Sequence, residues 1–175
     1  MFISVSRQFK FKLYAMKRIL TLFSTFLLFN CNSTAQKESP KDSESFAVQK
    51  TEAEWKAILS PEAFYVMRKE GTERPFSSPL NKNYDDGTYV CVACGTPLFK
   101  SEHKFDSGTG WPSFDREIQG NVAFSTDYNL GYARTEEHCA TCGGHLGHVF
   151  NDGPRNTTGK RHCINGVALK FVPKK

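Results

Sequence analysis

The sequence has little charge imbalance once its first 30 residues are set aside. Those residues contain five lysines or arginines and no acidic residue. Subtracting these five from the 23 basic residues of the whole chain leaves 18, which equals the number of acidic residues. A domain without excess positive charge lacks the electrostatic basis for binding phosphate backbones. Nucleic acid is therefore not an expected partner.

The chain also lacks an apolar run long enough for a conventional membrane-spanning helix. The apolar run at residues 19–29 has 11 residues, whereas a spanning helix needs about 20. The run follows Lys17 and Arg18 and precedes a polar break, which is typical of a secretion signal that starts at Met16. A buried core helix is the alternative, but the polar tract that follows gives it nothing to pack on. We expect residues 1–31 to be a signal peptide.

Cysteine is scarce, and the first cysteine, Cys31, stands apart from the others. It follows the letters LLFN, which resemble a bacterial lipobox, although Asn30 is atypical at that place. Acylation would make the protein a membrane-anchored lipoprotein, and cleavage after Ala35 would instead release it into the periplasm. Either event removes Cys31 from thiol chemistry. We expect an exported bacterial protein whose only membrane contact is this anchor.

The rest of the chain divides into a linker and one domain. Residues 32–50 are rich in Ser, Lys, Glu and Asp, so they cannot bury enough apolar surface to fold and should form a flexible linker. The domain, residues 51–175, begins with two predicted helices. Thr51 and Glu54 fit a capping box for the first helix, and Gly71 is expected to end the second. Beyond residue 81, short β-rich runs are separated by Gly, Asp, Asn and Pro, which predicts a mainly β domain of antiparallel strands. The runs are residues 88–92, 97–100, 122–127, 130–136 and 167–172.

Four of the six cysteines form two CxxC pairs, Cys91 with Cys94 and Cys139 with Cys142. Two such pairs can place four thiolates around one Zn²⁺ ion, and a site with four thiolates is structural because no position is left for water. Local disulfides or a redox-active dithiol are the alternatives. Each disulfide would close only a tiny loop, and β-rich runs rather than a βαβ unit flank the pairs. One structural zinc per chain is the preferred interpretation.

The last cysteine, Cys163, has no partner nearby in the sequence and lies in an apolar, strand-like run. A lone cysteine is often a small buried hydrophobe. Its neighbours Arg161 and His162 favour the other interpretation, because cations stabilise the reactive thiolate. His162 is expected to point to the opposite face of the strand, since neighbouring side chains alternate.

Two further segments supply polar and aromatic candidates. His145, His148 and Asp152 occur in a Gly-rich stretch that we expect to be a loop, and Trp111 and Phe114 occur in another. A thiolate, an acid–base imidazole and an aromatic wall suit attack on a soft, apolar electrophile.

Four motifs together resemble the B-type methionine sulfoxide reductases, the MsrB family, over about residues 55–173. They are CVACGTPLF, KFDSGTGWPSF, CATCGGHLGHVFNDGP and RHCINGVALKF, in this order. The resemblance implies two antiparallel sheets arranged like a tent, with a structural zinc. It also implies a peptide-methionine (R)-S-oxide reductase that repairs oxidised proteins under oxidative stress.

The resemblance also implies roles for individual residues. Cys163 would attack the sulfoxide sulfur and become a sulfenic acid. His148 and Asn165 would hold or protonate the departing oxygen, and Trp111 would face the methyl group of the substrate. The other residues expected around the site, as orienting or substrate-binding groups, are His145, Asp152, Arg161 and Phe114.

Two positions depart from the family pattern. Many members have a resolving cysteine where this chain has Thr109, and most have a tyrosine where it has His162. A hydroxyl cannot resolve a sulfenic acid, so we expect a one-cysteine cycle in which an external, thioredoxin-like thiol reduces Cys163 directly. If the protein is exported, this reductant must work outside the cytoplasm. We expect a monomer.

Two other functions are compatible with part of the pattern. A zinc-ribbon binding module would explain the CxxC pairs but not Cys163, Trp111 or the histidines. A thiol–disulfide oxidoreductase would use the CxxC pairs themselves, and bound metal would exclude it because both pairs would then be occupied.

Overall fold

The computed structural model describes residues 45–175. The predicted signal peptide, the cysteine of the lipobox and residues 32–44 of the predicted linker lie outside the described residues. Within the described part of the chain, no helix has the length and apolar character needed to cross a membrane.

Two helices precede the sheets, as the sequence predicts. Helix α2 covers Glu52–Ile58 and helix α3 covers Pro61–Lys69. The predicted capping box is present, because the Thr51 hydroxyl accepts a hydrogen bond from the Glu54 N–H and the Glu54 carboxylate accepts one from the Thr51 N–H. Helix α3 ends one residue earlier than expected, with Glu70 as its left-handed C-cap (φ 54°).

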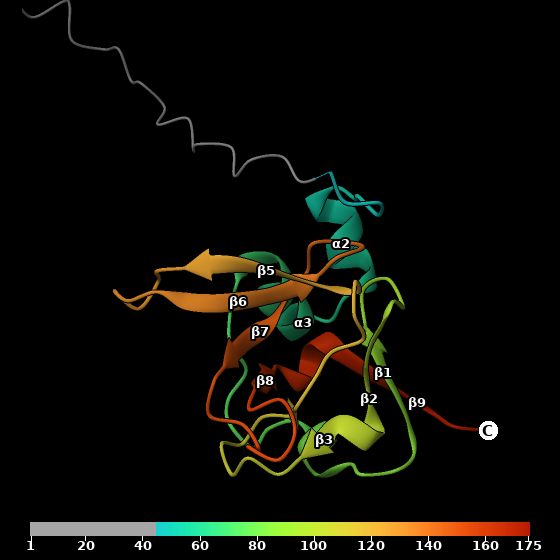
Figure 1. Cartoon of the computed structure of the whole chain (residues 1–175). Coiled ribbons are helices and arrows are strands. Elements are labelled where there is room, and N and C mark those ends of the chain that lie inside the picture. The colour runs from blue at the N-terminus through green and yellow to red at the C-terminus, as the bar shows by residue number, and fades with distance from the viewer. Residues whose placement is uncertain (1–44) are drawn as a thin grey trace, which may run out of the picture. The chain divides into compact units, whose positions relative to one another are not determined.

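Two antiparallel sheets form the rest of the domain (Figure 1), which confirms the predicted fold class. The smaller sheet has the strand order β2-β1-β9, and the larger has the order β3-β4-β8-β7-β6-β5. The strands are β1 (Gly87–Cys91), β2 (Pro97–Lys100), β3 (Lys104–Phe105), β4 (Ser113–Phe114), β5 (Val122–Asp127), β6 (Arg134–Cys139), β7 (His145–Phe150), β8 (Arg161–Ile164) and β9 (Leu169–Pro173). The 3₁₀ helices are η1 (Pro79–Lys82), η2 (Ser101–His103) and η3 (Gly166–Ala168).

The structure corrects the expectation that the His145–Asp152 segment is a loop. Most of it forms β7, an inner strand of the larger sheet. Gly147 permits this placement, since a β-carbon added there would lie 2.0 Å from the carbonyl oxygen of Cys163 on β8. The glycine therefore lets the two strands approach closely. Strand β6 also begins later than the predicted run at 130–136 does.

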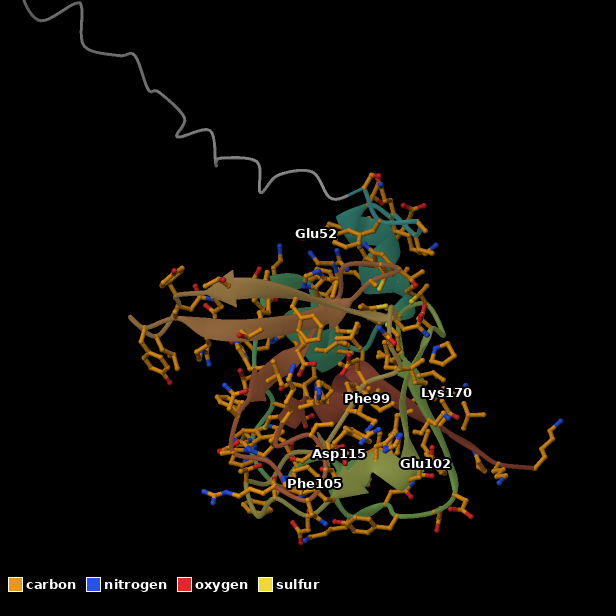
Figure 2. All side chains as sticks on the ribbon, viewed as in Figure 1. Glu52, Phe99, Glu102, Phe105, Asp115 and Lys170 are labelled. Carbon is orange, nitrogen blue, oxygen red and sulfur yellow. The ribbon has the colours of Figure 1, made fainter. Side chains whose placement is uncertain are left out.

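The core lies between the helices and the two sheets. Trp55 is buried, as expected, and Phe99 lies inside the domain whereas Glu52 and Lys170 lie at its periphery (Figure 2). The ring of Phe114 stacks on that of Phe99 with centroids 4.4 Å apart. The face of β4 that carries Phe114 therefore packs against the apolar core.

The domain begins before residue 51, which corrects part of the predicted linker. The Val48 N–H donates to the Thr141 carbonyl at 2.9 Å. The ring of Phe46 packs edge-on against His138 with centroids 5.8 Å apart. These residues pack beside the second CxxC pair, so they belong to the folded domain.

Candidate active site

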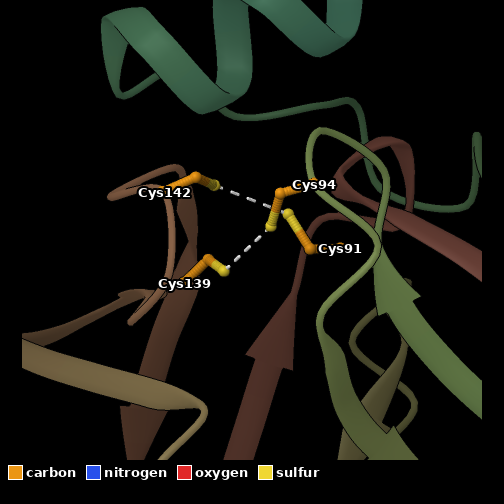
Figure 3. Close-up of side chains that lie close together, drawn as sticks. All are labelled: Cys91, Cys94, Cys139 and Cys142. Carbon is orange, nitrogen blue, oxygen red and sulfur yellow. Dashed lines mark hydrogen bonds between the residues drawn. The ribbon is translucent and has the colours of Figure 1, made fainter. Parts of the chain in front are cut away.

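The four CxxC cysteines converge, although 44 residues separate the two pairs in the sequence (Figure 3). Their sulfur atoms all lie within 4.8 Å of one another. The Sγ atoms of Cys91 and Cys142 are 3.8 Å apart, and those of Cys94 and Cys139 are 3.6 Å apart. Four sulfurs at about 2.3 Å from a tetrahedral ion would be separated by about 3.8 Å. The cluster therefore has the composition and spacing of a four-thiolate metal site.

Cys163 lies in a row of polar residues that crosses the larger sheet. In the strand register, Ser113 pairs with Cys163, Cys163 with His148, His148 with Glu136, and Glu136 with Ser125. Directly paired residues of antiparallel strands point to the same face. We call these five residues the polar row. The register thus brings the predicted nucleophile and the predicted acid together.

The other face of strand β8 carries His162, as the alternation of side chains predicts. This histidine is fully buried, and its Nδ1 lies 2.5 Å from the Oε1 of Glu137, which is also fully buried. Phe114 pairs with His162 in the register and is likewise buried. This position corrects the prediction that Phe114 contacts the substrate, because its ring packs in the core on the face opposite Cys163.

The thiol of Cys163 is half-buried between Thr109 and Arg161. Burial raises the pKa of the Cys163 thiol, while the charge of Arg161 and a hydrogen bond from Thr109 act in the opposite direction without overcoming it. Arg161 is held by Asp152 through two hydrogen bonds of 2.9 Å. Arg161 therefore favours the thiolate, as expected, but burial has the larger effect.

A short chain of hydroxyl groups leads away from Cys163. The Thr109 Oγ1 lies 3.9 Å from the sulfur and 2.8 Å from the Ser107 Oγ. The Ser107 Oγ lies 2.7 Å from the Ser113 Oγ, which donates to the Trp111 carbonyl at 3.1 Å. On this side, the Cys163 sulfur therefore faces a hydroxyl group and not a second thiol.

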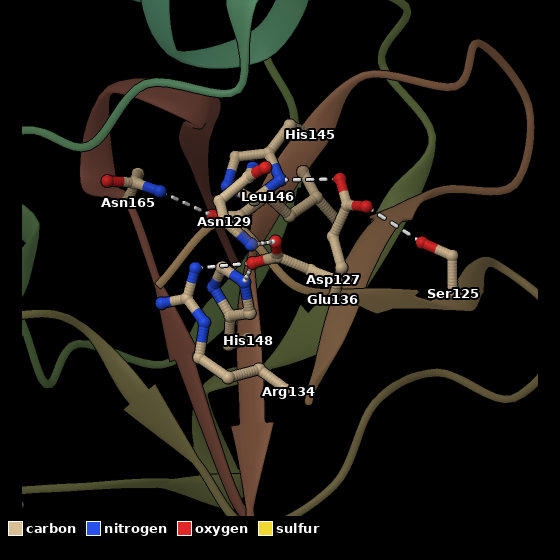
Figure 4. A network of polar contacts seen from close by, with 9 residues as sticks. All are labelled: Ser125, Asp127, Asn129, Arg134, Glu136, His145, Leu146, His148 and Asn165. Carbon is tan, nitrogen blue, oxygen red and sulfur yellow. Dashed lines mark hydrogen bonds and ion pairs between the residues drawn. The ribbon is translucent and has the colours of Figure 1, made fainter. Parts of the chain in front are cut away.

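His148 is held by an acidic partner that the sequence did not reveal (Figure 4). Its Nε2 lies 2.7 Å from the Oδ2 of Asp127, and this oxygen also forms an ion pair with Arg134. The Oδ1 of Asp127 accepts the Asn129 N–H at 2.6 Å. Burial acts to raise the pKa of Asp127, but these three partners outweigh it and lower the pKa to about 2. Burial lowers the pKa of His148 despite the Asp127 hydrogen bond. Asp127 therefore stays ionised and fixes the imidazole.

His145 is buried and contacts His148. Its Nδ1 lies 2.8 Å from the Oε1 of Glu136, whose other oxygen accepts the Ser125 hydroxyl at 2.7 Å. The two histidine rings meet edge to face with centroids 5.4 Å apart. His145 therefore packs against His148, and its predicted orienting role stays a prediction.

Glu73 connects two of the predicted residues and was not recognised in the sequence. Its backbone carbonyl accepts the Trp111 indole N–H at 3.3 Å, and its backbone N–H donates to the Asn165 side-chain oxygen at 3.0 Å. Its buried carboxylate accepts the first two N–H groups of η3, at 2.6 and 2.9 Å. The Asn165 amide also donates to the Leu146 carbonyl at 2.9 Å. Glu73 therefore links the Trp111 loop to the Asn165 turn.

A hollow of about 510 Å³ lies elsewhere, beside the smaller sheet. It is lined by charged and polar residues, including Lys100, Glu102 and Lys174, and contains neither a thiol nor an imidazole. It therefore offers none of the chemistry gathered around Cys163.

Comparison with known proteins connects this geometry to a family. The SelR domain model matches residues 59–173. A peptide methionine sulfoxide reductase MsrB of Chromohalobacter salexigens is 51% identical over 127 residues, which cover 72% of this chain and 96% of that protein. The chain belongs to the MsrB family. An MsrB of Leptospira interrogans is 52% identical over 128 residues, covering 73% of this chain and 97% of that protein. An MsrB of Methanosarcina barkeri is 53% identical over 126 residues, or 71% and 88% of the two chains. Membership confirms the resemblance of the four motifs to MsrB proteins.

Proposed function

We propose that this chain reduces methionine-R-sulfoxide in proteins and peptides to methionine, with Cys163 as the nucleophile. Its relatives are named peptide methionine sulfoxide reductases. The observation that carries the proposal is the direct pairing of Cys163 with His148 on one face of the sheet. A nucleophile and an acid–base group within reach of one substrate are the minimum that this chemistry needs.

The proposed reaction transfers one oxygen atom from the substrate to the enzyme. The Cys163 thiolate attacks the sulfoxide sulfur while the sulfoxide oxygen takes up one proton, which gives a hydroxylated sulfur bonded to Cys163. The hydroxyl group then passes to the Cys163 sulfur as the S–O bond and the new S–S bond of the substrate sulfur break. Methionine leaves with its sulfur reduced by two electrons, and Cys163 is left as a sulfenic acid. The Cys163 sulfur is oxidised by the same two electrons, so electrons and oxygen balance.

The surrounding residues have distinct proposed roles. His148, fixed by Asp127, supplies a proton to the oxygen, and the amide of Asn165 holds that oxygen. Trp111 faces the methyl group, because an indole face suits a sulfur that becomes positive as its oxygen is protonated. Selectivity for the R-epimer then follows, since methyl group, oxygen and peptide chain each need a separate side of the site.

We propose that an external thiol closes the cycle. The Thr109 hydroxyl lies 3.9 Å from the sulfur, and the other cysteines among the described residues belong to the four-cysteine cluster. A dithiol of the thioredoxin type would reduce the sulfenic acid to a thiol, releasing water and becoming a disulfide. The proposed export signal and the proposed anchor at Cys31 would place this reductant outside the cytoplasm.

We propose Zn²⁺ for the four-cysteine cluster. Zn²⁺ prefers thiolate ligands and tetrahedral geometry, and the sulfur spacing fits both preferences. Cys91, Cys94, Cys139 and Cys142 would hold the ion and join the end of β1 to the end of β6. Since four thiolates leave no open position, the ion would stabilise the fold and take no part in the reaction.

The proposal is tested by incubating the protein with separated epimers of a capped methionine sulfoxide and dithiothreitol. We expect the R-epimer to be consumed and the S-epimer to remain. Reduction of neither epimer would refute the activity, and equal reduction of both would refute the proposed stereochemistry. Without reductant, one turnover should leave a sulfenic acid at Cys163, and an intramolecular disulfide there would exclude the one-cysteine cycle.

A further inference from the structure

The most exposed large apolar side chains of the described residues occur on two segments that adjoin the active site. Their exposed fractions are 66% for Phe76, 67% for Tyr128, 60% for Leu130 and 58% for Tyr132, and the other large apolar residues are less exposed. Isolated apolar side chains are normal on a surface, but a group of them beside a functional site indicates an interaction surface.

Three of these side chains lie at the tip of the β5–β6 hairpin, which projects beyond the other strands (Figure 1). The tip begins and ends at the paired residues Asp127 and Arg134. The Asp127 carboxylate that holds His148 also accepts the N–H of Asn129 in the tip. Gly131 closes the turn with φ 81°. The tip is therefore attached to the group that positions the catalytic imidazole.

The fourth side chain, Phe76, lies on the other side of the site. Its backbone has φ 63°, a strained conformation for a bulky residue, and its N–H donates to the Gly110 carbonyl at 2.7 Å. A β-carbon added at Gly110 would lie 2.9 Å from the Phe76 ring, so the ring packs on the backbone beside Trp111. Backbone strain of this kind is found most often at active sites and ligand-binding segments.

We propose that the hairpin tip and Phe76 bind the apolar residues that flank methionine sulfoxide in an unfolded substrate polypeptide. This inference rests on the proposed function. A polypeptide substrate must leave the site on both sides of its reacting residue. In the larger sheet, β8 with Cys163 lies between β4, which follows the Gly110 segment bonded to Phe76, and β6, which begins at the hairpin tip. Methionine is most often buried in folded proteins, and core-forming segments carry further apolar residues at a period of 2 or 3.6. These residues become exposed when the protein unfolds.

The spacing of the strands indicates which substrate residues reach the tip. Strand β6 is two strands away from β8 in the larger sheet, which corresponds to about 10 Å at the usual strand separation. The tip begins at Arg134, two residues along β6 from Glu136, which is level with Cys163, so the separation is about 12 Å. An extended polypeptide covers about 3.3–3.6 Å per residue, so contact begins about four residues from the methionine sulfoxide. A capped single residue therefore cannot reach the hairpin tip.

The test compares three substrates that contain one methionine-R-sulfoxide. They are the N-acetylated amide of the residue, a nine-residue peptide with Leu, Val and Phe as flanking residues, and a peptide of equal length and charge with Ser, Gly and Asn. The first variant is Y128S/L130S/Y132S. The second is F76G, because glycine adopts a positive φ without strain. A matched control, I58S/Y84S/V172S, removes three exposed apolar side chains on elements outside the larger sheet.

For the parent protein, we expect kcat/KM to be about tenfold higher for the apolar peptide than for the polar peptide, equivalent to about 1.4 kcal/mol. Each site-adjacent variant should lose most of this preference through KM, and the control should keep it. All four proteins should reduce the capped residue equally. A preference retained in both variants, or absent from the parent, would overturn the inference. Loss of dimerisation in the tip variant with unchanged peptide kinetics would show instead that a second copy covers the tip.

Discussion

Replacement of Thr109 by cysteine should convert the proposed one-cysteine cycle into a two-cysteine cycle. The Thr109 Oγ1 lies 3.9 Å from the Cys163 sulfur, and a disulfide needs about 2.05 Å between its sulfurs, so the two side chains must approach by about 1.9 Å. Gly108 and Gly110 flank the position with φ 72° and 95°, which allows a local backbone adjustment. We expect Cys163 sulfenic acid to condense with the new thiol and release water.

The resulting disulfide would close a loop of 55 residues from position 109 to position 163. Loss of loop-closure entropy in the unfolded chain predicts a stabilisation of about 4 kcal/mol for the oxidised variant. Mass spectrometry after one turnover without reductant should detect the disulfide, and urea unfolding of oxidised and reduced protein should give the stability difference. T109S is the matched control and should form no disulfide. Accumulation of a stable sulfenic acid in T109C would show that Thr109 is not positioned as described.

The remaining predictions concern three other parts of the structure. Glu73→Gln should lower the free energy of unfolding by about 2–3 kcal/mol in a urea titration. The glutamine NH₂ group cannot accept a hydrogen bond, so one N–H of η3 loses its acceptor. An unchanged titration would contradict the linking role. Arg161→Gln removes a charge that lowers the pKa of Cys163, so the pH profile of iodoacetamide alkylation should move to higher pH and the rate at pH 7 should fall about three- to tenfold; a shift to lower pH would refute this. Cys139→Ser should abolish binding of one zinc per chain and lower Tm by at least about 10 °C, whereas a metal-free variant with the parent's Tm would exclude a structural zinc.

Features that depend on neighbouring residues could be predicted from the sequence. The capping box at Thr51 and Glu54 is such a feature, because its two partners lie within one helical turn. The position of His162 opposite Cys163 followed from strand alternation alone. The two CxxC pairs predicted a shared metal site because the two residues between the cysteines of each pair let both sulfurs bind the same ion.

Features that depend on distant partners could not be predicted. Glu73 is a single acidic residue in a polar stretch, and its importance appears only when η3, more than 90 residues later, provides the N–H groups that it accepts. Asp127 has the same difficulty, because the strand register and not the sequence places it beside His148. Phe114 was assigned to the site from its motif, but the pleat of β4 directs its ring into the core.

The central claim, that Cys163 is the nucleophile, is tested most directly by the Cys163→Ser variant. The variant should be compared with the parent after both are shown to have equal metal content and equal Tm. We predict that reduction of the R-epimer of a capped methionine sulfoxide falls by at least about a thousandfold, as expected when a nucleophile is removed. A folded, metal-loaded variant that reduces the R-epimer as fast as the parent would contradict the account.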